Sequence, residues 1–204
     1  MEPREELAVC RMCEGFSLDD ALALDAAHIA EYGFAIVGVE SAEGEEPHAP
    51  WAYTIGLLDA ADHPELIVAG ATTQLAGSFL SGLAHMVIDD GDRFEAGEEI
   101  DIGRGSLRFG AVNEIQYALD TFNMWHNLSE YGAIETYALE ALQVVLPPSC
   151  FCEEHGFAQP LLANPTARVG GREPFRNRAP RRSKGRRPPR ARGLPWPPPG
   201  RAGR

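Results

Sequence analysis

The chain has 204 residues, enough for one domain of ordinary size and a further segment, and its hydrophobic content of 44% is normal for a globular core. No apolar run approaches the roughly 18 residues of a membrane span, and the acidic residues 1–6 do not resemble a signal peptide, so we expect a cytoplasmic protein. Residues 1–167 hold 29 acidic and 5 basic residues, a net charge of −24, whereas residues 168–204 hold 1 acidic and 13 basic residues, a net charge of +12. Because the first part is so acidic, it is unlikely to bind nucleic acid.

The first element in chain order is a predicted helix that starts at Ser17. Its hydroxyl is placed to accept hydrogen bonds from the free N–H groups of the first turn, with Asp20 as a capping-box partner. Apolar residues then recur at helical spacing until Gly33, which supplies a left-handed stop. Residues 34–39 are predicted to form a short strand, and an acidic loop follows them.

The next two segments predict strands. Residues 51–58 alternate large apolar side chains with the small ones of Ala52, Thr54 and Gly56, so we expect something to pack closely on the small face. Residues 66–70 are apolar on both faces, which is typical of a central strand.

The remaining elements are two helices, a hairpin and a strand. An apolar stripe predicts a second helix that ends near Gly91. Residues 98–112 predict a hairpin that turns at Gly103. We expect a third helix over residues 122–131 and a last strand over residues 140–146.

Helices are interspersed with strands, but several strands follow one another directly. This order favours an α+β fold, a single domain with a mixed or mostly antiparallel sheet packed by about three helices, over a doubly wound parallel sheet. We place this domain at residues 8–163. Residues 164–204 are rich in Arg, Pro, Gly and Ala and nearly lack aliphatic residues, so we predict a disordered tail.

Two motifs are specific enough to suggest a family. They are Tyr-Thr-Ile-Gly-Leu at residues 53–57 and His-Pro-Glu-Leu at residues 63–66. Supporting segments occur, in chain order, at residues 10–15, 32–39, 51–57, 63–68, 141–145 and 159–162. In this combination the chain resembles the bacterial domain-of-unknown-function family 4262 over roughly residues 8 to 163. The resemblance implies one domain and no particular activity, because that family is uncharacterised.

One segment departs from the family pattern. Residues 149–155 read Ser-Cys-Phe-Cys-Glu-Glu-His where a Phe-Pro-Trp-like segment follows the last strand, so a role of this segment is not implied by the resemblance. A fainter similarity is to suppressor-of-fused-like domains, which also place a Tyr…Gly-Leu strand before a Glu-Leu strand. Such domains mostly bind other proteins, so the similarity favours a protein partner, although a fold analogy does not establish function.

The four cysteines form two clusters. Cys10 and Cys13 make a C-x-x-C pair, and Cys150, Cys152 and His155 make a C-x-C-x-x-H group. Thiols stay reduced in the cytosol, and thiolate and imidazole are ligands that zinc prefers, so the clusters predict a shared structural zinc site. The alternative is that the cysteines are buried or idle thiols and that the two clusters lie far apart.

Polar residues around the central strand carry a second hypothesis. His63 and Glu65 stand at the start of this strand, and with Tyr53, Thr54 and His126 they predict a small polar pocket or an acid/base pair. The alternative is a rigid strand start in which His63 caps a turn, since a lone His/Glu pair fits many sites.

Three interpretations of the basic tail are open. Residues 172–192 suit non-specific contact with nucleic acid or a membrane surface. They also suit folding back against the acidic body, whose opposite charge attracts them. The third interpretation is out-of-frame translation of GC-rich DNA, which gives the same composition.

The sequence contains no phosphate loop, nucleophile elbow, dinucleotide fingerprint or H-E-x-x-H motif. We therefore interpret the domain as a non-catalytic protein-interaction module in bacterial toxin immunity or stress. The alternative is a metal-dependent or hydrolase-like enzyme that uses Tyr53, His63 and Glu65. Geometry separates the two, because a pocket that gathers these residues with His126 favours the enzyme and a flat acidic face favours binding.

Overall fold

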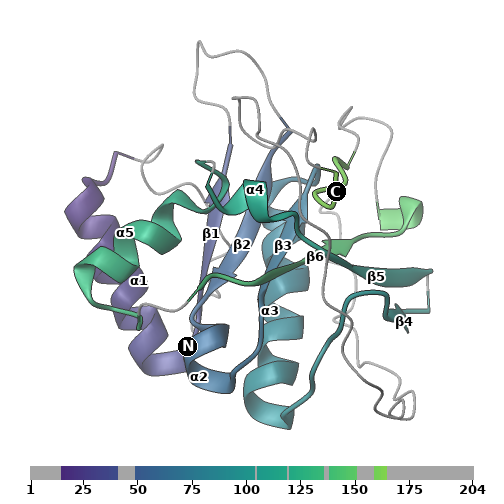
Figure 1. Ribbon diagram of the computed structural model, residues 1–204, viewed down its shortest axis with the longest axis horizontal. Coiled ribbons are helices and arrows are strands. Elements are labelled where there is room, and N and C mark those ends of the chain that lie inside the picture. The colour runs from purple at the N-terminus through teal and green to yellow at the C-terminus, as the bar shows by residue number, and fades with distance from the viewer. Residues whose placement is uncertain are drawn as a thin grey trace, which may run out of the picture.

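The computed structural model of the chain describes residues 15–40, 49–103, 105–118, 120–135, 138–150 and 159–164. These residues form a six-stranded sheet in the order β1-β2-β3-β6-β5-β4 (Figure 1). The pair β3–β6 is parallel and the other neighbours are antiparallel. The strands are β1 (Ala35–Val39), β2 (Trp51–Ile55), β3 (Glu65–Ala69), β4 (Glu99–Asp101), β5 (Ser106–Ala111) and β6 (Ala141–Val145). The predicted α+β fold with a mixed sheet is confirmed.

Helices cover both faces of the sheet. Helix α3 packs on one face, where Phe79 and Leu83 join a core with Leu66 and Val68 of β3. Helices α1 and α5 lie side by side over the other face (Figure 1). The helices of the described residues are α1 (Leu18–Tyr32), α2 (Leu57–Ala61), α3 (Thr73–Asp90), α4 (Glu114–Tyr117) and α5 (Asn123–Tyr131), with short 3-10 turns at Asp120–Phe122 and Pro148–Cys150.

Helix α1 begins and ends at the residues that the sequence indicates, and α3 ends at the predicted glycine. The Ser17 hydroxyl accepts a hydrogen bond from the Asp20 N–H at 3.2 Å and donates one to the Asp20 carboxylate at 2.6 Å. Gly33 ends α1 with a φ of 83°. Thr72 caps α3 in the same way, and Gly91 ends it with a φ of 70°. Local signals therefore fix both helices.

The prediction of a strand through residue 58 is wrong at its end. Strand β2 stops at Ile55, Gly56 takes a φ of 112°, and helix α2 starts at Leu57. The expected close packing at Gly56 is confirmed, because a Cβ added there would lie 2.7 Å from the Gly33 carbonyl oxygen. Only glycine combines this backbone angle with so close a neighbour.

The later elements follow the predictions with two additions. The hairpin is formed by β4 and β5, and the third helix is α5, which starts one residue later than expected. Helix α4 and the 3-10 turn before α5 were not expected. Asn113 starts α4, since its side-chain oxygen accepts a hydrogen bond from the Ile115 N–H at 3.1 Å.

The segment 159–164 completes the core beside β6. The Gln143 side-chain amide donates to the Pro160 carbonyl at 2.7 Å and accepts from the Leu162 N–H at 2.6 Å. Leu162 is fully buried. The fold therefore includes residues well past β6, and the predicted tail beyond residue 164 lies outside the described residues.

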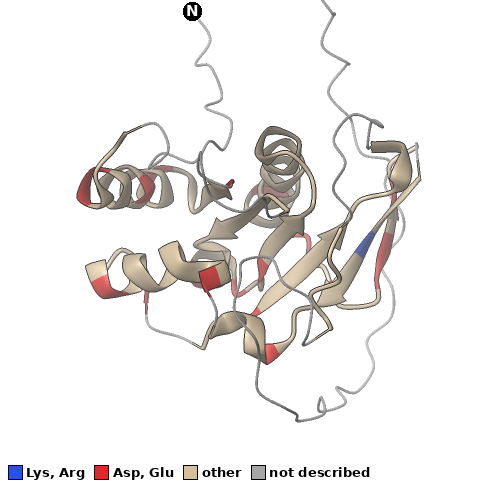
Figure 2. Cartoon of the chain, turned by 90° about the horizontal axis from the view of Figure 1, so that it is seen from above, with Lys and Arg blue, Asp and Glu red and all other residues tan. Residues whose placement is uncertain are grey.

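The described surface is strongly acidic. Across the described ranges there are 20 Asp and Glu residues against two arginines, Arg93 and Arg108. Figure 2 shows acidic positions spread over several helices and loops and along the edge of the sheet. None of the helices in the described ranges is long and apolar enough to cross a membrane.

Candidate functional site

Glu65 is the first residue of β3, and its side chain is fully buried. From β3 it caps helix α2, which follows the neighbouring strand β2. Its carboxylate accepts hydrogen bonds from the Thr54 hydroxyl at 2.7 Å and the Gly56 N–H at 2.8 Å. It also accepts weaker ones from the N–H groups of Leu57 and Leu58, at 3.4 and 3.3 Å. The first N–H groups of a helix have no partner within the helix, and its N-terminus favours negative charge. Glu65 therefore satisfies the start of α2.

Thr54 joins β2 to β3 through its side chain. The backbone pairing of these strands ends at Tyr53 and Ile67. Beyond this point the Leu66 N–H donates to the Thr54 hydroxyl oxygen at 2.8 Å, while the hydroxyl donates to Glu65. The Thr54 hydroxyl thus takes the place of the backbone carbonyl that would accept this hydrogen bond in a longer strand pairing. Thr54, Glu65 and Leu66 are all inaccessible to solvent.

Burial governs the charge state of Glu65. Removal from water raises the pKa of its carboxyl to about 7, against the opposing effect of the hydrogen bonds from Thr54 and the α2 N–H groups. A carboxyl that titrates near neutral pH has a pKa suited to acid/base chemistry. Its oxygen atoms, however, face backbone N–H groups and a hydroxyl of the protein.

His63 is also fully buried and joins two loops. Its Nδ1–H donates to the Pro64 carbonyl at 2.6 Å, and its Nε2 accepts from the Phe94 N–H at 3.0 Å. The ring lies edge-on to the Phe94 ring, with centroids 5.5 Å apart. Burial is the main cause that lowers the pKa of His63 below its ordinary value. The His63 imidazole is therefore neutral and forms hydrogen bonds through both nitrogens. These bonds hold the start of β3 against the loop that follows α3.

Tyr53 points to the opposite face of β2 from Thr54. Its hydroxyl oxygen accepts a hydrogen bond from the Met124 N–H at 3.1 Å, near the start of α5. Its ring packs edge-on against Phe122, with centroids 5.1 Å apart. Burial strongly raises the pKa of the Tyr53 hydroxyl. Tyr53 thus links the sheet to α5 through the core that contains Phe122 and Trp125.

The five polar residues predicted to form one pocket are arranged in separate places. Thr54 and Glu65 are in contact, whereas His63 bonds with Pro64 and Phe94 and Tyr53 bonds with Met124. His126 lies on the exposed side of α5, where its Nε2–H donates to the Tyr117 carbonyl at 3.0 Å. The structure brings two of the five residues together.

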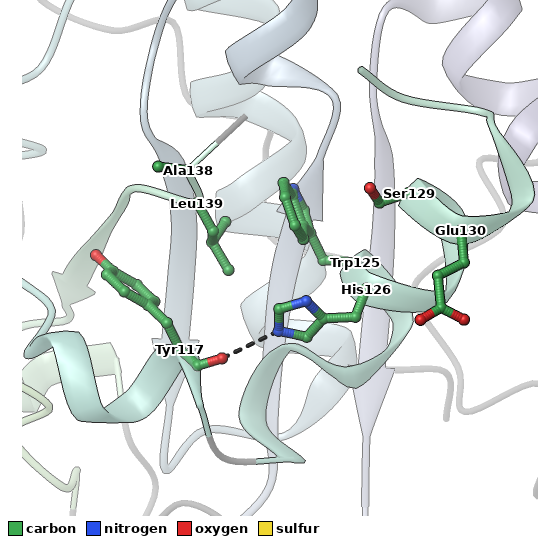
Figure 3. A pocket seen from close by; sticks show the side chains of 7 residues that line it. All are labelled: Tyr117, Trp125, His126, Ser129, Glu130, Ala138 and Leu139. Atoms are coloured by element: carbon green, nitrogen blue, oxygen red, sulfur yellow. Dashed lines mark hydrogen bonds between the residues drawn. The ribbon is translucent and has the colours of Figure 1, made fainter. Parts of the chain in front are cut away.

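A surface hollow of about 490 Å³ lies beside α5 and includes His126. In Figure 3 the His126 ring lies between the Tyr117 carbonyl and the Trp125 side chain, and the Glu130 carboxylate lies further along the same helix. The Trp125 and His126 rings are edge-on at a centroid distance of 5.3 Å. The residues that line the hollow are Tyr117, Trp125, His126, Ser129, Glu130, Ala138 and Leu139.

One carboxylate lines this hollow and two more lie near Tyr117. Glu130 lines the hollow and is exposed. Burial raises the pKa of Tyr117, and the nearby carboxylates of Glu140 and Glu114 raise it further. Neither Arg93 nor Arg108 lines the hollow. The hollow thus combines aromatic and apolar walls with the carboxylate of Glu130, a set of groups suited to hold an arginine side chain.

Sequence reasoning identified only His126 among the residues of the hollow. His126, Ser129 and Glu130 are three and four residues apart on α5, which places them on one side of a helix. This spacing was a usable signal. The opposite wall comes from Tyr117 and residues 138–139, which lie in other elements, so only the folded chain brings the walls together.

The zinc hypothesis rests mostly on residues outside the described ranges. Cys10, Cys13, Cys152 and His155 lie outside the described residues, and Cys150 is half-buried. Within the described ranges, no group of three or more His, Cys, Asp and Glu side chains is arranged to hold a metal ion. A shared zinc site stays a prediction.

Comparison with known proteins gives one result. The model of the family described as "Domain of unknown function (DUF4262)" matches residues 28–149, which is more than half of the chain. No curated protein matches the chain, and no solved structure matches it. The match includes the two specific motifs at residues 53–57 and 63–66, whose polar side chains build the buried hydrogen bonds around β3. The chain belongs to the DUF4262 family.

Proposed function

We propose that the domain is a non-catalytic module that binds a basic segment of another protein in the hollow beside α5. The observation that carries the proposal is the combination in this one hollow of two aromatic residues, Trp125 and Tyr117, with the exposed carboxylate of Glu130. A place in toxin immunity or stress stays a prediction.

Charge supports a basic partner. With 18 acidic residues outside the buried class and two arginines across the described ranges, the surface attracts cations over distances of about 10 Å at moderate salt. Such a field increases the rate of encounter, while the hollow provides the specific contact. Arginine suits the hollow better than lysine does, because a guanidinium both stacks on aromatic rings and pairs with a carboxylate through two N–H groups.

The catalytic alternative has no comparable support in the described residues. His63 and Glu65 are fully buried, and the contacts of their polar atoms are with the protein's own backbone and Thr54. A general base must come within hydrogen-bond reach of its substrate. His63 and Glu65 instead occupy positions where they hold the fold together.

The proposal is tested by calorimetric titration of the full chain with a short oligoarginine peptide at low ionic strength. Glu130→Lys reverses a charge that lines the hollow, and we expect it to weaken binding by about threefold or more, since a rim charge pair contributes up to about 1 kcal/mol. Asp90→Lys, at the exposed end of α3, makes the same charge change away from the hollow and is the matched control.

The two variants give a clear decision. Loss of affinity in Glu130→Lys with little change in Asp90→Lys supports the hollow. Equal weakening in both would mean that the peptide responds to net charge alone and would overturn the proposed site. Oligolysine of the same length should bind more weakly than oligoarginine, because lysine lacks the planar group that stacks on an aromatic ring.

A further inference from the structure

The described chain leaves the fold close to the hollow. The Leu162 carbonyl accepts a hydrogen bond from the Asn113 N–H at 3.0 Å, and Asn113 caps α4. Helix α4 ends at Tyr117, which lines the hollow, and it is only four residues long, or about 6 Å at the rise of an α-helix. The residues that follow Asn164 therefore start beside α4, whose last residue lines the hollow.

The segment that follows has the opposite charge to the carboxylates at and near the hollow. From Arg168 onward the sequence holds 13 basic residues and one acidic residue, and its proline content is high. Glu130 lines the hollow, and Glu114 and Glu140, which are not among its lining residues, are close enough to raise the pKa of Tyr117. The 40 residues after Asn164 are long enough to reach the hollow even if only a few of them are extended, at about 3.3 Å for each residue.

We propose that the chain's own arginine-rich segment, residues 172–192, docks in the hollow beside α5 and competes there with an external basic partner. This inference rests on the proposed function, since it assigns a second occupant to the same site. A tethered segment has an effective concentration in the millimolar range, so weak contacts suffice to populate the docked state. The tail then sets a threshold that a partner must exceed.

The sequence offers a sharp test, because Lys184 is its single lysine and lies within this segment. A carbodiimide joins an amine to a carboxylate only when the two are in contact. In the full chain we expect Lys184 to link to Glu130, Glu114 or Glu140 at several times the yield found for Asp89 and Asp90, which are exposed at the end of α3. The yield should fall in 1 M salt, which screens surface charges beyond about 3 Å.

Cross-links of Lys184 that are spread over all exposed carboxylates, or that join different molecules only, would overturn the docking. Digestion and mass spectrometry identify the linked residues, and dilution separates links within one chain from links between chains. The N-terminal amine provides an internal reference for unspecific reaction.

A second variant separates this inference from the proposed function. Replacing Arg181, Arg182, Arg186 and Arg187 by glutamine keeps Lys184 and removes most of the local charge. We expect this chain to lose the selective cross-link and to bind oligoarginine several-fold more tightly than the wild type. Unchanged affinity together with unselective cross-linking in the wild type would sink the tail docking and leave the proposed function standing. A neutralised chain that takes no oligoarginine would contradict the proposed function itself.

Discussion

At the scale of single residues, the family motifs describe a scaffold. Glu65, Thr54 and His63 look like reactive groups in the sequence, yet each is fully buried and bonded to a nearby element. A buried polar group without a partner costs about 1–3 kcal/mol. The hydrogen bonds therefore explain why these residue types occur together at the start of β3.

The charge state of Glu65 predicts a pH dependence of stability. Its folded pKa of about 7 lies above the ordinary glutamate value of 4.5, so the folded state binds the proton more tightly than the unfolded state. The contribution of Glu65 is then greatest below pH 4.5 and is lost as the pH rises to about 7. In the Glu65→Gln variant an amide replaces the neutral carboxyl group, and this amide does not titrate.

We expect the wild type to lose free energy of unfolding relative to Glu65→Gln between pH 4.5 and 7, by about 1.4 kcal/mol for each unit of pKa shift. Urea denaturation of both chains across this range measures the difference. If the free energy of unfolding of the wild type rose relative to that of the glutamine variant over the same range, the hydrogen bonds from the first N–H groups of α2 would be keeping the Glu65 carboxylate ionised.

Gly56 gives a second prediction at this scale. Gly56→Ala should lower the free energy of unfolding by about 2 kcal/mol or more, because the φ of 112° strains any side chain and the new Cβ lies 2.7 Å from a backbone oxygen. Gly82→Ala is the control, since a Cβ there meets nothing within 4 Å and alanine favours the α3 helix by up to about 1 kcal/mol. Equal effects of the two substitutions in denaturant titrations would refute the close-packing account.

At the scale of elements, sequence reasoning succeeded where the signals are local. The caps of α1, the glycine that ends α3 and the turn between β4 and β5 are encoded by neighbouring residues. It failed at α2, whose first N–H groups are satisfied by Glu65 from a different strand. A helix of five residues has little stability of its own. Its existence depends on a contact that only the folded sheet supplies.

The candidate pocket shows the same limit. Alternation along β2 already places Tyr53 and Thr54 on opposite faces, so grouping them with His63 and Glu65 neglected a signal that was present. The wall formed by Tyr117 and Leu139 opposite α5 had no local signal, because those residues are apart in sequence.

The segment 159–164 predicts a sharp boundary of the fold. A chain that ends at residue 164 should keep its stability, whereas one that ends at residue 158 loses buried Leu162 and leaves the Gln143 amide without its partners. We expect the shorter chain to be less stable by about 2–4 kcal/mol. Thermal unfolding of the two chains side by side measures this, and equal melting temperatures would place the end of the core before residue 159.

At the scale of the whole molecule, two parts of the structure have different roles. The centre of the sheet, where the family motifs lie, is rigidly hydrogen-bonded and closed to solvent. The outer side of α5 carries an open hollow lined by aromatic side chains and the exposed carboxylate of Glu130. A division of charge between an acidic body and a basic tail of this size is consistent with a surface that is regulated by its own chain.

The most direct measurement is hydrogen exchange of the chain with the neutralised tail, with and without saturating oligoarginine. The account predicts slower exchange in residues 114–131, which contain α4 and α5, and unchanged exchange in residues 53–66. Protection that appears at residues 53–66 and spares residues 114–131 would move the binding site to the family motifs and contradict the account.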